Sequence, residues 1–127
     1  MSLTLRTARC RFTEALAALI TFATTRGYEL ALAEGMDRKT AKDPTSDHML
    51  HSNHDIGLAQ DIDLYLGGVW LTHSEDHSML GTFWEDYGVE HGLPLVWGGN
   101  FPPVEVNGKL VDRSDGNHYS LRWQGKA

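Results

Sequence analysis

Residues 52–61 of the chain read Ser-Asn-His-Asp-Ile-Gly-Leu-Ala-Gln-Asp, and residues 115–118 read Asp-Gly-Asn-His. Together these stretches hold the side chains of a hydrolytic zinc site. Two imidazoles and one carboxylate, from His54, Asp61 and His118, can fill three corners of a tetrahedron and leave the fourth for water. The remaining carboxylate, Asp115, lies three positions before His118 and could accept a proton from that water. A turn at Gly57 must bring His54 and Asp61 together.

The composition predicts one domain, residues 1–127, with a hydrophobic core of its own, because 127 residues are too few for a catalytic module plus a separate binding module. The net charge of −6 argues against nucleic acid as a partner and disfavours stable association with anionic membranes. With a single cysteine, Cys10, the chain can form no internal disulfide, so the redox compartment stays open.

The N-terminal region has the pattern of a core helix. Apolar residues recur at three- and four-residue spacing within 12–23, Glu14 is expected in the first turn, and Gly27 follows as a stop signal. Three arginines before the apolar run at 15–23 superficially resemble a secretory leader, but the helical periodicity favours the core helix. We therefore expect synthesis in the cytoplasm without a signal peptide.

The remaining pattern mixes strands and helices without regular βαβ alternation. We expect strands at 28–33, 95–97 and 118–121, a hairpin within 59–71 that turns at Gly67-Gly68, and loops at 34–53 and 98–103. A second helix is expected over 74–91, started by a capping box of Thr72 with Glu75. The fold class predicted is α+β: a small antiparallel sheet flanked by two main helices, with the zinc site at the sheet face.

At these residues the chain resembles the zinc peptidases that cut bacterial cell-wall peptides: D-Ala-D-Ala carboxypeptidases and dipeptidases, and phage L-alanyl-D-glutamate endolysins. Their first signature, Ser-x-His, six residues and Asp, is met by Ser52, His54 and Asp61. Their second, an acidic residue, two variable positions and His, is met by Asp115 and His118, with Trp97-Gly98-Gly99 before it. The similarity extends from about Phe12 to Leu121.

The resemblance implies that His54, Asp61 and His118 bind Zn2+ and that Asp115 is the general base. Ser52 would orient a ligand or a substrate carboxylate, although a loop hydroxyl bonded to its own backbone explains it equally well. Relatives usually carry a Glu-x-x-Arg pattern after the first strand, whereas here Asp37 stands at the arginine position and Arg38 follows it. Arg38 is the candidate for stabilising the oxyanion, with a solvated loop charge as its alternative.

The aromatic and histidine patterns leave other possibilities. The four tryptophans suggest a carbohydrate platform, but Trp84 fits the core better, and Trp97 is the candidate for a substrate-binding wall of the cleft. His73 and His77 have a spacing that can chelate zinc, yet the glutamate position of a His-Glu-x-x-His motif is wrong, which favours a solvated helix face.

The function that the resemblance implies is zinc-dependent hydrolysis of peptidoglycan stem peptides by a phage-type endolysin that cuts the L-Ala-D-Glu bond. The alternatives are a D,D-carboxypeptidase that releases terminal D-Ala and a non-catalytic zinc-containing wall-binding module. We expect a monomer whose partner is the stem peptide and which acts on the cell wall after release from the cell.

Overall fold

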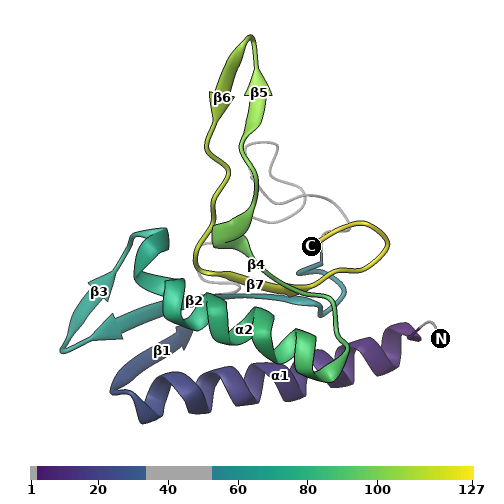
Figure 1. Ribbon diagram of the computed structural model, residues 1–127. Helices are drawn as coiled ribbons and strands as arrows, with labels where there is room; N and C mark the ends of the chain where they lie inside the picture. The colour runs from purple at the N-terminus through teal and green to yellow at the C-terminus, as the bar shows by residue number, and fades with distance from the viewer. Residues whose placement is uncertain (1–2, 34–52) are drawn as a thin grey trace.

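The structure is a computed structural model that describes residues 3–33 and 53–127 (Figure 1). Its elements in chain order are the helix α1 (Leu5–Thr25), the strands β1 (Tyr28–Leu32), β2 (Ala59–Leu66) and β3 (Val69–Leu71), the 3-10 helix η1 (Ser74–His77), the helix α2 (Ser78–His91), the strand β4 (Leu95–Trp97), the 3-10 helix η2 (Gly98–Asn100), and the strands β5 (Val104–Val106), β6 (Lys109–Val111) and β7 (His118–Leu121). The predicted α+β class is confirmed.

The long strand β2 is the centre of a five-stranded antiparallel sheet. Its first residues, 59–61, pair with β7, which in turn pairs with β4. Residues 62–66 of β2 pair with β1 on one side, and residues 64–66 pair with β3 on the other. The two-residue turn at Gly67 and Gly68 has φ of +57° and +79°, so the predicted hairpin is confirmed.

Both helices pack against one face of this sheet and enclose the core with it. Trp84 of α2 contacts the rings of Phe12 in α1 and Tyr119 in β7 edge-on, at centroid distances of 5.6 and 5.9 Å. The indole Nε1 of Trp84 donates to the carbonyl oxygens of Val96 and Ser120, both at 3.1 Å. Within residues 3–33 and 53–127, neither helix has the length and apolar character needed to cross a bilayer.

The first helix is longer than its apolar periodicity indicated. Thr4 caps the N-terminus by accepting a hydrogen bond from the Thr7 backbone N–H at 3.1 Å. Glu14 therefore lies in the middle of α1, where it pairs with Arg11, and its predicted place in the first turn was wrong. Gly27, with φ of +89°, follows the helix as predicted.

The second helix begins differently from the prediction. Residues 74–77 form the 3-10 turn η1, and the α-helix starts only at Ser78. The backbone N–H of His73, and not a Thr72 and Glu75 pair, takes part in the capping interaction, donating to Asp76 at 3.0 Å. This tight turn places Ser74 beside the segment that precedes β7.

The hairpin of β5 and β6 was missed, because residues 98–103 were read as a loop and the following segment was not assigned. Asn107 and Gly108 have φ of +51° and +79°, as a type I′ turn requires. The Asn-Gly pair between Val-Glu-Val and Lys-Leu-Val was the available signal. The hairpin projects from the sheet, and all six of its strand residues are exposed (Figure 1).

Gly81→Ala is expected to destabilise the protein, although alanine is the better helix former by about 1 kcal/mol. An added Cβ at Gly81 would collide with the ring of Trp97, and overpacking of this kind costs about 1–3 kcal/mol. Urea unfolding measures the difference, with Thr82→Ala as the exposed control in the same helix. Equal stability of Gly81→Ala and wild type would contradict this packing.

Candidate metal centre

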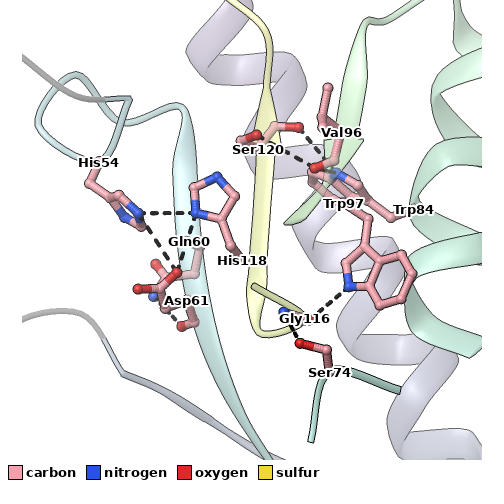
Figure 2. Close-up of polar contacts among 10 residues, drawn as sticks. All are labelled: His54, Gln60, Asp61, Ser74, Trp84, Val96, Trp97, Gly116, His118 and Ser120. Atoms are coloured by element: carbon pink, nitrogen blue, oxygen red, sulfur yellow. Dashed lines mark hydrogen bonds and ion pairs between the residues drawn. The ribbon is translucent and has the colours of Figure 1, made fainter. Parts of the chain in front are cut away.

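Three sequence-predicted ligands come together on the face of the sheet opposite the helices (Figure 2). His54 lies in the turn that precedes β2, Asp61 is in β2, and His118 begins β7. Asp61 and His118 are directly opposite one another in the antiparallel pairing of these strands. Because opposed residues project to the same face, strand pairing alone places two of the three groups side by side.

The three groups form a triangle of the size that a metal ion needs. The distance from His54 Nε2 to His118 Nδ1 is 3.2 Å, that from His118 Nδ1 to Asp61 Oδ1 is 3.4 Å, and that from His54 Nε2 to Asp61 Oδ1 is 3.7 Å. A tetrahedral ion with N and O ligands at about 2.0–2.2 Å has ligand–ligand edges of about 3.3–3.6 Å. The residues therefore fit a metal ion with one coordination position left for another ligand.

The turn that carries His54 is fixed from two sides. Gly57 has φ of +77° in the left-handed region, which a glycine adopts without strain. Asn53 is buried, and its Nδ2 donates to the carbonyl oxygens of Leu121 at 2.9 Å and Lys126 at 2.8 Å. The amide of Asn53 thus ties the ligand-bearing turn to the C-terminal end of the chain.

The turn at residues 115–118 is held by a second set of bonds. The backbone N–H of Asp115 donates to Gly98 O at 2.9 Å, and that of His118 donates to Asp115 O at 3.0 Å. Trp97 Nε1 donates to Gly116 O at 2.7 Å, and Gly116 N–H donates to Ser74 Oγ at 3.0 Å (Figure 2). Hydrogen bonds from β4, η1 and η2 therefore define the conformation that presents His118.

Gly98 is required where these segments meet. A Cβ at this position would collide with the carbonyl oxygen of Asp115 and with the side chain of His118. Gly98 thus permits a close backbone approach that any larger residue would prevent.

Asp115 is an exposed residue in the turn that precedes β7. Desolvation by its neighbours raises the pKa of the Asp115 carboxyl above its usual value, and the negative charge of Asp61 raises it further. The imidazoles of His118 and His54 lower the same pKa. All three candidate ligands therefore act electrostatically on Asp115.

The ring of His118 is positioned by contacts that the sequence did not reveal. Phe101 packs against it with centroids 5.2 Å apart. His118 Nε2 is buried and accepts or donates no hydrogen bond within the described parts of the chain. Packing thus orients this imidazole, whereas many metal-binding histidines are oriented by a hydrogen bond from the ring nitrogen that does not bind the metal. Phe101, Ser74 and Asn53 are the supporting residues that sequence reasoning missed.

Arg38 and Ser52 lie outside the described residues, so their roles stay predictions. Trp97 is only 8% exposed, and its indole packs over Gly81 and Gly99 while it bonds Gly116. Its visible role is to support the 115–118 turn, and contact with substrate also stays a prediction.

The rival pair of histidines does not form a metal site. Among the described residues, His54, Asp61 and His118 are the group that could hold an ion. His77 is buried and shares a hydrogen bond of 2.8 Å with the Tyr119 hydroxyl, so the expected solvated face was wrong for this residue. Burial lowers the pKa of His77 and raises that of Tyr119.

A solved structure with a similar fold is that of the L-Ala D-Glu endopeptidase ChiX of Serratia marcescens. The match has a TM-score of 0.64, covers 93% of this chain and 83% of that chain, and has 18% sequence identity. At this identity the match shows a common fold. No protein-family model matches the sequence, and no curated protein matches it either.

Removing one ligand is expected to abolish metal binding. We expect metal-free wild-type protein to take up about one Zn2+ per chain, and an ion at a hundred times its Kd adds about 2.7 kcal/mol to the free energy of unfolding. Thermal unfolding with and without ZnCl2 should show this gain for wild type and for His91→Ala, an exposed control. His54→Ala and His118→Ala should show little gain; a full gain in both would place the ion elsewhere.

His77 should make stability depend on pH. Because burial lowers the pKa of His77 in the folded state, the unfolded chain takes up its proton first as the pH falls. Neutral His77 therefore makes its full contribution to the free energy of unfolding above about pH 6.5, the unperturbed pKa of histidine. This contribution is lost as the pH falls below that value. Urea unfolding measured between about pH 8 and about pH 5 is the test. The free energy of unfolding should fall more steeply with decreasing pH for wild type than for His77→Gln. Parallel pH profiles would contradict the assignment.

Proposed function

We propose that this protein is a zinc metallopeptidase that hydrolyses peptidoglycan stem peptides at the L-Ala-D-Glu bond. The observation that carries the proposal is the triangle of His54, Asp61 and His118, with edges of 3.2–3.7 Å, beside the carboxylate of Asp115. The fold shared with an L-Ala D-Glu endopeptidase supports the same substrate class.

The donor set favours zinc as the ion. Two imidazole nitrogens and one carboxylate oxygen are common ligands of catalytic zinc, which keeps a fourth position open. When bound, zinc supplies Lewis acidity, which polarises a carbonyl group and lowers the pKa of water. His54, Asp61 and His118 would hold it.

Asp115 is the residue of the chain that would move protons. In hydrolysis, a bond forms between the oxygen of water and the carbonyl carbon, and the bond from that carbon to the amide nitrogen breaks. The carboxylate of Asp115 would accept the proton that water loses and deliver it to the departing amine. Backbone hydrogen bonds from Asp115 to Gly98 and from His118 to Asp115 fix the main chain that carries this carboxylate.

An endopeptidase is favoured over a D,D-carboxypeptidase. Capture of a terminal carboxylate needs positive potential, whereas the chain has a net charge of −6. The fold match is also with an endopeptidase. Arg38 is proposed to stabilise the developing oxyanion.

A wall-binding module without catalysis would have no need of Asp115 beside the three ligands. We further propose the biological setting of a phage-type endolysin: a monomer that acts on the cell wall after release from the cell.

Digestion of purified peptidoglycan is the test of this function. Mass analysis of the fragments should show new N-terminal D-Glu ends with little free D-Ala. Asp115→Asn should keep the metal while kcat/KM falls by about 10²- to 10⁴-fold, the usual contribution of a general base. Asp112→Asn is the matched control, because Asp112 is an exposed carboxylate in the same segment whose oxygen accepts from Ser114 N–H, which an asparagine also allows.

The outcomes separate the candidate functions. Free D-Ala as the main product would show a D,D-carboxypeptidase with the same metal site. Metal binding without any hydrolysis by wild type would show a binding module. Full activity of Asp115→Asn would remove Asp115 from the mechanism.

A further inference from the structure

The face of the sheet that carries the metal centre continues beyond it along β2. Side chains alternate between the two faces of a strand, and Ile62 and Leu64 enter the core. Asp61 and Tyr65 are four residues apart and therefore share the other face. At about 3.3 Å per residue, they are roughly 13 Å apart along the strand.

Two aromatic residues occupy opposed positions on this face near the far end of β2. Trp70 of β3 is directly opposite Tyr65 in the antiparallel register, so the two side chains are neighbours on one face. Trp70 is 57% exposed, and Tyr65 is half-buried. On the other side of Tyr65, the opposed residue of β1 is Glu29, which is exposed. We call Tyr65 and Trp70 the aromatic pair.

The position of this pair is specified by the hairpin. The turn at Gly67 and Gly68 fixes Leu66 opposite Val69 and hence Tyr65 opposite Trp70. A one-residue slip would turn Trp70 to the helix side. The register therefore holds the Trp70 ring in solvent opposite Tyr65, on the same face as the metal centre. Tyrosine and tryptophan are enriched at binding interfaces, because each combines a large apolar ring with a polar group.

We propose that Tyr65 and Trp70 bind a sugar ring of the glycan strand to which the stem peptide is attached. This proposal rests on the proposed function and adds a subsite to it. A pyranose ring has an apolar C–H face that packs against an aromatic ring, and hydroxyl groups at its edge that Glu29 and the Tyr65 hydroxyl can accept from.

The spacing fits the geometry of the substrate. One L-Ala residue and one lactyl group separate the L-Ala-D-Glu bond from the muramic acid ring. Each is about 3.5 Å long when extended, which puts the ring and its neighbouring sugar roughly 7–15 Å from the bond. The aromatic pair lies within this range of Asp61 along β2. A peptide bond near the metal centre and a sugar on the aromatic pair can therefore be occupied together.

The test compares two substrates that differ only in the sugars: a disaccharide–tetrapeptide and the same tetrapeptide with an N-terminal lactyl group but no sugar ring. Wild type should have a kcat/KM about tenfold higher for the glycan-bearing substrate, the effect of roughly 1.4 kcal/mol from ring stacking. Trp70→Ala should reduce this ratio to near one, and Trp70→Phe should restore most of it. Val69→Ala is the matched control, because Val69 is 60% exposed on the opposite face of the same strand and should leave the ratio unchanged.

Two outcomes would overturn the proposal. A wild-type ratio near one would show that the sugars are not bound. An equal loss by Trp70→Ala on both substrates would show that Trp70 contacts the peptide, such as its diamino acid, or supports the fold.

A binding measurement separates this proposal from the proposed function. Peptide-free glycan strands should co-sediment with wild-type protein and less with Trp70→Ala, whether or not the protein hydrolyses peptides. If neither substrate is cut, the peptidase function fails while this binding difference still decides the glycan subsite. Equal binding of the glycan by wild type and by Trp70→Ala would refute the glycan subsite.

Discussion

The pairing of Asp61 with His118 across β2 and β7 is the constraint on which the site depends. These residues are far apart in the chain, yet the antiparallel register sets them opposite one another on one face of the sheet. Their ligand atoms are 3.4 Å apart, so a metal ion would meet a triangle that folding has already assembled. The core packing of Ile62 and Tyr119 on the other face maintains this register. Stability of the core and geometry of the metal centre are therefore properties of the same two strands.

Small residues and buried polar groups connect the helix layer to the site. Trp97 lies over Gly81 of α2, and its indole N–H reaches the turn that precedes His118. Its backbone N–H donates to Glu85 of the same helix at 3.0 Å. Movement of α2 would therefore reach Asp115 and His118 through one indole ring. This close packing restricts the sequences that can adopt the fold, because it needs glycine at positions where a larger residue would otherwise be tolerated.

The sequence predicted the elements with clear periodicity and the residues of the two signatures. Strands with alternating burial and the Gly67-Gly68 turn were recognisable because those signals are local. The supports of the site were not: Asn53 bonds residues near the C-terminus, and Ser74 bonds Gly116, so their importance depends on contacts that only the fold creates. The start of α2 was misplaced because Thr72 and Glu75 have the spacing of a capping box, but η1 intervenes.

The hydrogen bond between Gly98 O and Asp115 N–H closes the chain at the base of the β5–β6 hairpin. Both ends of the hairpin are thereby anchored, and the positions of His118 and Asp115 are set below it by contacts with Trp97 and Ser74. The entropic cost of bringing the ends of a loop together rises only slowly with the length of the loop. The hairpin is consequently a module that evolution can lengthen, shorten or exchange, altering what the protein contacts at this edge while the framework of the candidate metal centre is retained.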